Sequence, residues 1–298
     1  MSEAIDLSVC VVNHRTPDLT RACVKSIYDT AGDLPIEVFV VNNTAEPCEL
    51  SDVVPPDAPF VFLQNERPMG FSANQNQMLR RARGRYRMCL NSDTIVHPGA
   101  LGELIRFMDA HPECAIAGPK LRFGDGTIQP SLRNFPAPFA SFVEVSGLWT
   151  RLKGKRWIRD RVLLCNLHDR VVESEWLHGA CYIVRHEAID QVGLWDEETF
   201  TMFGEDADWC WRMRAAGWKI LFDPAAEITH LEGRTPYDDR AIALWEGGMR
   251  FVRKHYTPLR FLPVRLSAGF AIVLRWVIAR NAAERRTFGL AFRQMFTA

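Results

Sequence analysis

The sequence lacks several features that mark particular classes of protein. Its eight cysteines are spread along the chain with no two within five residues of each other, so it has no CxxC metal or redox pair. Several of them, Cys10 and Cys89 among them, lie within apolar runs, which favours reduced, buried thiols in a cytoplasmic protein. The first twenty residues contain no basic segment followed by an apolar one, so we expect no secretory signal.

Net charge, long apolar runs and glycine-rich loops are also missing. Lys and Arg number 36 and Asp and Glu number 36, and this balance argues against nucleic acid as a partner. No stretch reaches the roughly eighteen uncharged apolar residues typical of a membrane-spanning helix. No GxGxxG follows the first apolar run, which argues against a NAD-dependent enzyme, and no internal repeat is visible.

The charge balance hides an asymmetry between the body of the chain and its C-terminal end. From Arg240 to the end, 11 Lys and Arg face 2 Asp and Glu, a net charge of +9, which leaves −9 on the rest. A basic tail on an acidic body suggests that the tail meets an anionic surface. Apolar residues make up 47% of the chain, enough to bury a sizeable core.

Apolar runs alternate with helical periods over the first 120 residues. Strands are expected at Leu7–Asn13, Ile36–Val41, Phe60–Leu63, Tyr86–Leu90 and Ile116–Pro119, with helices from Thr16-Pro17, over Phe71–Ala82 and from Pro98 to about Ala110. This alternation predicts an α/β fold with a mostly parallel central sheet flanked by helices. Ligands of such sheets bind at the carboxyl ends of the strands. We therefore expect Asn13, Asn42 and Asn91–Asp93 to gather at one edge.

The second half of the chain has a different pattern. Gly124-Asp125-Gly126 predicts a turn between short extended segments, and residues 150–172 show no clear period and suggest a surface connection. The remaining elements are expected to be a strand over Trp176–Arg185, a helix over Glu205–Ala216 that ends at Gly217, a short strand at Ile228–His230 and mostly helix from Asp238 onward.

The triplet Asn91-Ser92-Asp93 directly follows a predicted strand. A carboxylate at this place suits Mg²⁺ or Mn²⁺, which prefer oxygen ligands and commonly share them with substrate phosphates. The alternative is that Asp93 only caps the turn into the next helix. His230, which closes the segment EITH, is by itself either a metal ligand or a packed histidine.

The densest acidic cluster is Gly204-Glu205-Asp206-Ala207-Asp208, just before the aromatic segment WCWRM. One interpretation is a general base with a partner carboxylate. The other is an acidic helix N-terminus, where the helix dipole lowers a carboxyl pKa and weakens it as a base unless burial or a neighbouring acid raises it again. Trp195, Trp209 and Trp211 are either core aromatics, the favoured interpretation, or platforms for a sugar.

Taken together, these segments resemble the family-two glycosyltransferases of GT-A fold, particularly the bacterial rhamnosyltransferase-like branch. The likeness lies in order and spacing from about residue 6 to 256. VVNHRTPDL, VVNNT, NERPMGFSANQNQ and LNSDT resemble the family's first strand and loop, second strand end, helix entry and metal-binding triplet. GTIQPSLRNFP is similar to a segment of the rhamnosyltransferase branch, the block from LHGACYIV to FGEDADW resembles the acceptor side with its glutamate-aspartate motif, and ITHLEGRT looks like the late histidine motif.

This resemblance implies a role for each matching residue. Asp93 would hold the Mn²⁺ or Mg²⁺ that bridges the donor diphosphate, with His230 completing the metal or phosphate contacts, and Asp206 would be the catalytic base. The donor site would include Asn13, Arg15, Asn42, Asn65, Gly70, Phe71, Asn76, Asn91, Ser92 and Asp93, and the acceptor site His178, Gly179, Trp195, Asp196 and Glu205. Asn42 stands where the family usually has an aspartate that reads the nucleobase; because an asparagine both donates and accepts, the identity of the base stays open.

The activity implied is inverting transfer of a sugar, best L-rhamnose from dTDP-rhamnose, to a glycan or lipid-linked glycan acceptor in bacterial cell-surface polysaccharide synthesis. Donors with UDP or GDP stay open. A nucleotidyltransferase of the same fold would need a glycine-rich basic loop, and NHRTPD after the first strand contains no glycine. A non-catalytic sugar-binding protein would not need the acidic cluster and the strand-end aspartate together.

The domain organisation predicted is a catalytic domain over 1–238, with a nucleotide-sugar half at about 1–120 and an acceptor half at about 121–238, and a helical extension over 239–298. In residues 258–280 four arginines share one side of a helical wheel, with Phe270, Leu274 and Val277 on the other: Arg260, Arg265, Arg275 and Arg280. Either this helix lies on the anionic inner face of the cytoplasmic membrane, near a lipid-linked acceptor, or it packs on the catalytic domain or in a homo-oligomer with its arginines solvated. The location expected is cytoplasmic and peripheral to that membrane.

Overall fold

The computed structural model describes residues 4–152, 155, 158, 164, 167–232, 240–279 and 282–297. Its first half is a parallel sheet whose strands pair in the order β3-β2-β1-β4. The strands are β1 (Leu7–Asn13), β2 (Ile36–Asn42), β3 (Phe60–Gln64) and β4 (Tyr86–Asn91). All residues of β1 and β2 are buried, as expected for parallel strands covered on both faces.

The second half of the chain extends the same sheet with mixed directions, in the order β4-β11-β6-β12-β5. These strands are β11 (Cys181–Arg185), β6 (Cys114–Arg122), β12 (Lys219–His230) and β5 (Thr94–Val96), joined at the margins by β7 (Ile128–Gln129) and β9 (Val172–Glu173). The strand β11 is antiparallel to both its neighbours, whereas β6 and β12 are parallel. A small second sheet pairs β8 (Leu132–Arg133) with β10 (Trp176–Leu177).

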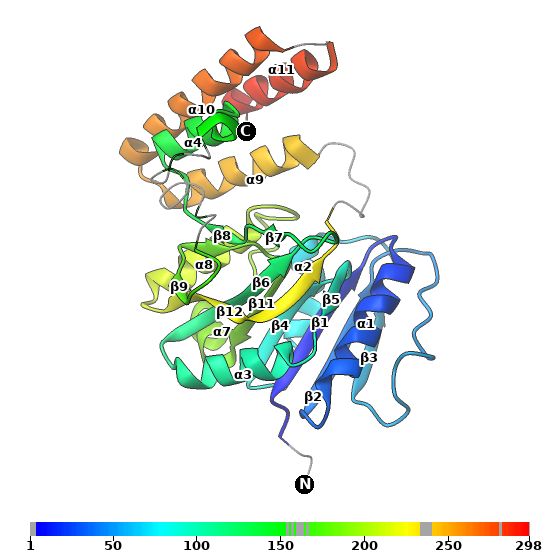
Figure 1. Ribbon diagram of the computed structural model, residues 1–298. Coiled ribbons are helices and arrows are strands. Elements are labelled where there is room, and N and C mark those ends of the chain that lie inside the picture. The colour runs from blue at the N-terminus through cyan, green and yellow to red at the C-terminus, as the bar shows by residue number, and fades with distance from the viewer. Residues whose placement is uncertain are drawn as a thin grey trace.

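Helices cover both faces of the large sheet (Figure 1). On one face lie α1 (Pro17–Ala31) and α3 (Ala100–Ala110), and on the other α2 (Phe71–Leu79), α7 (His186–Val192) and α8 (Glu205–Ala215). Successive side chains of β1 alternate between these two cores: Val9 and Val11 join the first, Cys10 and Val12 the second. The α/β fold with a mostly parallel sheet between helices is thus confirmed.

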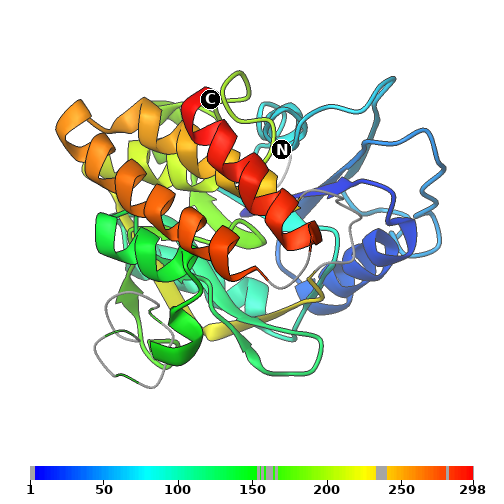
Figure 2. The ribbon, with the colours of Figure 1, turned by 90° about the horizontal axis from the view of Figure 1, so that it is seen from above.

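A further helical layer lies beyond the carboxyl ends of the parallel strands (Figures 1 and 2). It consists of α9 (Arg240–His255), α10 (Pro258–Ile278), α11 (Ala282–Thr297), α4 (Pro138–Val145) and the short α5 (Trp149–Leu152). Phe251, Val252 and Tyr256 of this layer pack with Phe200 and Ala207 of the catalytic domain. The helical C-terminal extension is confirmed, although the expected boundary at residue 238 lies outside the described residues.

Several element bounds differ from those expected. The strand expected at Ile228–His230 is the end of the twelve-residue β12, whose register shifts between Asp223 and Glu227 and so breaks the alternation that would reveal it. The single strand expected over Trp176–Arg185 is two strands in different sheets, separated at residues 178–180. The helix α2 ends at Leu79 rather than Ala82, and α3 begins two residues after Pro98, following Gly99 with φ +82°.

The cysteines fit the expectation of buried thiols. The seven within the described residues are all buried and unpaired, and Cys165 lies outside that part of the chain. Burial raises the pKa of Cys23 to about 12, so this thiol stays protonated and unreactive.

Candidate active site

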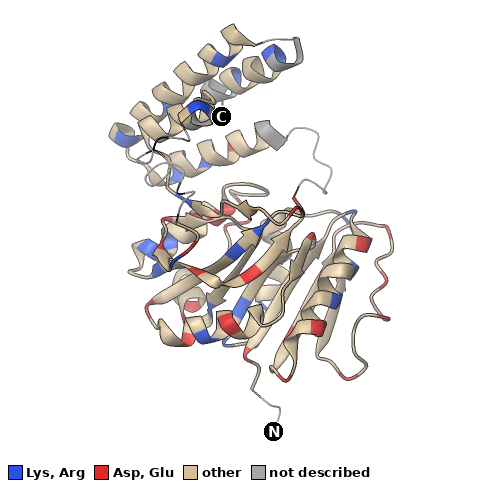
Figure 3. Cartoon of the chain, in the orientation of Figure 1, with Lys and Arg blue, Asp and Glu red and all other residues tan. Residues whose placement is uncertain are grey.

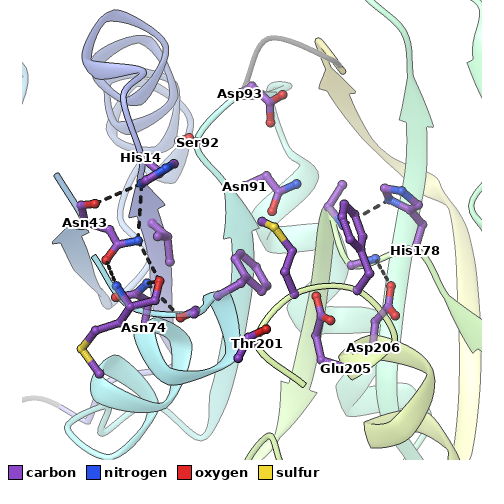
Figure 4. A pocket seen from close by; sticks show the side chains of 18 of the residues that line it. His14, Asn43, Asn74, Asn91, Ser92, Asp93, His178, Thr201, Glu205 and Asp206 are labelled. Carbon is purple, nitrogen blue, oxygen red and sulfur yellow. Dashed lines mark hydrogen bonds between the residues drawn. The ribbon is translucent and has the colours of Figure 1, made fainter. Parts of the chain in front are cut away.

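A cavity of about 380 Å³ opens at the carboxyl edge of the sheet, between the ends of β1 and β4 and the N-terminus of α8 (Figure 4). Its size suits a small-molecule ligand. The lining residues come from strand ends and the loops that follow them: Val12, His14, Asn43, Met69, Gly70, Phe71, Asn74, Asn91, Ser92, Asp93, His178, Gly179, Ala180, Thr201, Met202, Phe203, Glu205, Asp206, His230 and Glu232.

The strand-end residues Asn13 and Asn42 lie side by side but do not line this cavity. They are register partners, both fully buried, and the Asn13 Nδ2 donates to the Asn42 Oδ1 at 2.6 Å. The Asn42 Nδ2 also donates to the Gln64 Oε1 at 2.8 Å. Because neighbouring side chains of a strand point to opposite sides, the next residues, His14 and Asn43, face the cavity instead. Sequence reasoning missed both, although each directly follows a residue that it selected.

Asn43 fixes the loop that carries Gly70 and Phe71. Its Oδ1 accepts from the Met69 backbone amide at 2.7 Å, and its Nδ2 donates to the Met69 carbonyl oxygen at 2.9 Å. Gly70 then packs so closely on Thr201 that a Cβ there would lie 2.8 Å from the Thr201 carbonyl oxygen, which explains the glycine. The Phe71 amide donates to that same oxygen at 2.7 Å, so this loop and the loop before α8 form one wall.

The asparagines of the NERPMGFSANQNQ segment serve the same wall. Asn65 does not line the cavity but donates from its Nδ2 to the Asn43 Oδ1 at 2.9 Å and to the Asn74 Oδ1 at 2.6 Å. Asn76 lies deeper, where its Nδ2 donates to the Trp195 carbonyl oxygen and its Oδ1 accepts from the Trp195 amide. Asn65 is therefore placed to support the loop and Asn76 to hold α2 against the backbone at Trp195, and their contact with a donor stays a prediction.

Three other predicted residues also lie away from the cavity lining. Arg15 is exposed at the end of β1 with a left-handed backbone, φ 59°. Trp195 is buried among Tyr182 and Trp209, as the core interpretation of this tryptophan expected. Asp196 accepts from the Lys254 Nζ at 2.7 Å and from the Thr199 amide at 3.0 Å. Their roles in donor or acceptor binding stay predictions.

Asp93 and His230 meet at the cavity, as the pairing of β5 with β12 requires. The His230 Nε2 lies 3.3 Å from the Asp93 Oδ1, and both side chains are almost fully buried. The Gln129 Nε2 donates to the Glu232 Oε2 at 3.1 Å, which turns the Gln129 Oε1 toward the His230 Nδ1 at 3.0 Å. The Nδ1 of His230 is thus held by Gln129, and the Nε2 is the ring nitrogen that faces Asp93 and could bind a cation there.

The donor set of this pair fits a divalent cation shared with a substrate. Among the described residues no group of three or more His, Cys, Asp and Glu is arranged to hold a metal ion. Asp93 and His230 would thus supply two ligands, with the remaining places open to phosphate oxygens and water, as is usual for Mg²⁺. Asn91 and Ser92, which directly precede Asp93 in the chain, also line the cavity (Figure 4).

Glu205 and Asp206 lie on the wall opposite His14 and Asn43 (Figure 4). The Asp206 Oδ1 accepts from the Ala207 amide at 2.8 Å and the Oδ2 from the Gly179 amide at 3.2 Å. Burial outweighs these bonds and raises the pKa of Asp206 to about 6. Burial and the charge of Asp206 raise the pKa of Glu205 well above its usual range, and its Oε2 has no hydrogen-bond partner among the described residues.

Burial thus favours the protonated form of both carboxyls, and the charge of Asp206 adds to this effect at Glu205. The sequence left open whether a helix N-terminus lowers the pKa of these carboxyls or burial raises it. In the structure burial has the larger effect, and both pKa values are raised. Asp208, two residues on, does not face the cavity. It accepts from the Arg212 Nε at 2.8 Å and lies 2.7 Å from the His255 Nε2 and 2.6 Å from the Lys254 Nζ, which ties α8 to α9.

Comparison with known protein sequences identifies the family of the chain. A family model described as "Glycosyltransferase like family 2" matches residues 5–244. The chain is 30% identical over 199 residues to the N-acetylglucosaminyl-diphospho-decaprenol L-rhamnosyltransferase of Mycobacterium tuberculosis, a match that covers 65% of this chain and 60% of that protein. The matched part therefore spans less than two thirds of the relative's length.

Solved structures share the fold at low identity. GalNAc-T7 with UDP, GalNAc and Mn²⁺ superimposes with a TM-score of 0.64 at 13% identity, covering 100% of this chain and 57% of that one. The mannosyltransferase PcManGT of Pyrobaculum calidifontis, in complex with GDP-Man and Mn²⁺, gives a TM-score of 0.56 at 15% identity, covering 100% and 76%. The fold is thus GT-A-like.

Proposed function

The chain belongs to glycosyltransferase family 2, and from this premise we propose that it transfers a sugar from a nucleoside-diphosphate donor to an acceptor hydroxyl, with inversion of the anomeric carbon. The observation that carries the proposal is the buried acid pair, which lines the same cavity as Asp93 and His230. A base and a cation site on one cavity are what a single displacement on a sugar diphosphate requires.

The residues divide the chemistry between them. Asp206, ionised at neutral pH, takes the proton of the acceptor hydroxyl as its oxygen attacks the anomeric carbon. Glu205, whose raised pKa favours the protonated form, is placed beside it to hydrogen-bond to the acceptor. A Mn²⁺ or Mg²⁺ ion held by Asp93 and His230 would offset the charge of the leaving diphosphate. Because the displacement is direct, no nucleophile from the protein is needed.

For the donor we propose dTDP-L-rhamnose. The support is the segment GTIQPSLRNFP, which is similar to a segment of rhamnosyltransferases, and the 30% identity to a protein named as an L-rhamnosyltransferase. Asn42 does not favour any particular nucleobase, because its side-chain amide is already hydrogen-bonded to Asn13, Gln64 and the Glu46 carbonyl oxygen. His14 and Asn43, at the cavity, are better placed to contact a nucleotide.

For the acceptor we propose a glycan linked through a diphosphate to a polyprenol, which places the reaction in bacterial cell-surface polysaccharide synthesis, at the inner face of the cytoplasmic membrane. The support is again the name of the mycobacterial relative, whose acceptor is a diphospho-decaprenol-linked N-acetylglucosamine. The exposed apolar helix of the C-terminal layer, described below, agrees with an acceptor held in a bilayer.

A panel of nucleotide sugars tests this proposal. We expect nucleoside diphosphate to be released from dTDP-L-rhamnose in the presence of Mn²⁺, faster when a GlcNAc-diphosphoprenol analogue is added, and the glycosidic product to have the inverted anomeric configuration by NMR. A preference for a UDP- or GDP-sugar would contradict the proposed donor but not the proposed reaction. Release of pyrophosphate from a nucleoside triphosphate and a sugar phosphate, or consumption of no donor, would contradict the class itself.

A further inference from the structure

The helix α10 presents an apolar side to the outside of the molecule. Its exposed residues recur at intervals of three and four and so form one stripe along the helix, with Leu259 90% exposed and Phe270 64% exposed. We call this stripe the outer face of α10: Leu259, Leu262, Leu266, Phe270, Val273 and Val277. Its other side, with Val264, Ala268, Ala271 and Ile272 buried, packs on α4 and α11. Monomeric proteins seldom expose so continuous a row of large apolar side chains.

The described arginines of α10 lie off the outer face, and each guanidinium lies over an aromatic ring. The Arg260 guanidinium lies over the Tyr256 ring at 4.1 Å and near the Trp211 ring at 5.4 Å. Arg265 lies over the Phe261 ring at 5.6 Å, and Arg275 over the Phe288 ring at 5.0 Å. The fourth arginine of the predicted wheel, Arg280, lies outside the described residues. The helix thus has two apolar sides: the inner one packs on the protein, with Val264 beside Phe200 and Ala207, and the outer face is left uncovered.

Basic groups flank this face on the next helix. In α11, Arg285, Arg286 and Arg293 are exposed beside the half-exposed Leu290 and Phe292. The two helices run side by side there, because the Trp276 Nε1 lies 3.9 Å from where a Cβ would stand at Gly289. In Figure 3 the charged residues coloured on α10 are basic, whereas basic and acidic residues are interspersed on the catalytic domain. Apolar side chains bordered by arginines complement an anionic lipid surface.

The layer that carries this face lies over the edge of the sheet at which the cavity opens (Figures 1 and 2). The helix α10 is, among the described residues, the one helix long and apolar enough to cross a membrane by length and composition. Crossing would, however, bring Arg265 and Arg275 into hydrocarbon and strip the small residues of its inner side from α4. A helix half covered by protein is instead suited to lie flat at the surface of a bilayer.

We propose that the outer face of α10, with the arginines of α11, binds an anionic lipid bilayer, with α10 lying in the interface and the cavity held near the membrane. The inference does not depend on the proposed activity, and its test needs no substrate. We expect the full-length protein to sediment with phosphatidylglycerol-containing vesicles, to bind phosphatidylcholine vesicles much more weakly, and to lose affinity for the anionic vesicles as salt rises.

Variants make the test specific. Leu266→Glu with Phe270→Glu should lower vesicle affinity about tenfold or more, since two exposed apolar side chains that would enter the bilayer become charged. Phe62→Glu, which places one such charge on a half-exposed residue of the distant strand β3, should bind as the wild type does and is the control for a glutamate outside the outer face. Arg285→Gln with Arg286→Gln should weaken binding to anionic vesicles alone. Thermal melting and dTDP binding would verify that each variant is folded.

Three outcomes would overturn the proposal. The first is a wild type that does not bind anionic vesicles, and the second is a Leu266→Glu, Phe270→Glu variant that binds them equally well. The third is bound protein that resists an alkaline carbonate wash, because a helix lying at the surface is released whereas a spanning helix is not. If light scattering shows instead a dimer that the double variant dissociates, without vesicle binding by the wild type, the face is an interface between two copies.

Discussion

Gly247 of α9 lies against Gly204 of the turn that precedes the acid pair. The Gly247 carbonyl oxygen is 2.7 Å from where a Cβ would stand at residue 204, and a Cβ at residue 247 would lie 2.6 Å from the Phe203 carbonyl carbon. Phe203 and Gly204 both have left-handed backbones, with φ 65° and 89°. Gly247, which lies just beyond the 5–244 family match, therefore fixes the turn from which Glu205 and Asp206 project.

The first prediction concerns this contact. Gly247→Ala should lower turnover about tenfold or more while leaving the protein folded, because the turn must shift and a small misplacement of a catalytic group is costly. Gly248→Ala is the matched control, since a Cβ there meets nothing within 4 Å and alanine favours a helix. Turnover and thermal melting of both variants test it. Equal turnover in the two variants would show that the contact does not position the acid pair.

The second prediction concerns the cation. Asp93→Ala should weaken nucleoside diphosphate binding at least tenfold when Mn²⁺ is present and little in EDTA, because the ion bridges the protein and the phosphates. His230→Ala should act in the same direction. Asp125→Ala removes an exposed carboxylate from a turn and should change neither affinity. Calorimetry measures all three; a wild type that binds the nucleotide equally with and without EDTA would remove the cation from the reaction.

The third prediction follows from the pKa of Asp206. As pH falls below about 6 the base becomes protonated, so turnover should drop about tenfold for each further pH unit. Above that value turnover should be flat on this account until another group titrates. Turnover measured between pH 4.5 and 8 at saturating donor, in buffers of constant ionic strength, tests for this fall on the acid side. A wild-type profile flat across pH 6 would mean that Asp206 does not act as a base.

The fourth prediction concerns stability. Because burial raises the pKa of Glu205, the folded state holds a proton that the unfolded chain releases above about pH 4.3, so this residue destabilises the protein increasingly as pH rises. Glu205→Gln should therefore raise the melting temperature at pH 8 and change it little at pH 4. Melting curves at the two pH values test the sign. A variant that melts lower than the wild type at pH 8 would show that the charge is well solvated.

Much of the nucleotide half of the fold could be predicted from the sequence, because its strands are continuous apolar runs such as Leu7–Asn13 and Ile36–Asn42 that end in polar residues. The long strand β12 could not, since the shift between Asp223 and Glu227 interrupts its period. Because ligands bind at the carboxyl ends of parallel strands, Asn13 and Asn42 are the residues expected at the cavity. The residues after them, His14 and Asn43, line it instead, since the direction of a side chain at a strand end depends on where strand pairing stops.

The pKa values of the acid pair could not be predicted from the sequence either. The sequence places Glu205 and Asp206 at a helix N-terminus, where the dipole lowers a carboxyl pKa. What reverses the direction is burial by residues distant in the chain, with α9 packed behind the turn, and this burial outweighs the hydrogen bond from the Gly179 amide, which lowers the pKa of Asp206. Long-range packing of this kind leaves no local pattern, so neither the pKa nor the contribution of Gly247 could be predicted.

The most direct test of the central claim is the turnover of Asp206→Asn at saturating donor and acceptor. We predict that this variant binds nucleoside diphosphate and Mn²⁺ nearly as the wild type does, because Asp206 lies apart from Asp93 and His230 on the cavity wall. Its turnover should fall roughly 10²-fold or more, the scale of general base catalysis. Near wild-type turnover with intact binding would contradict the assignment of Asp206 as the base.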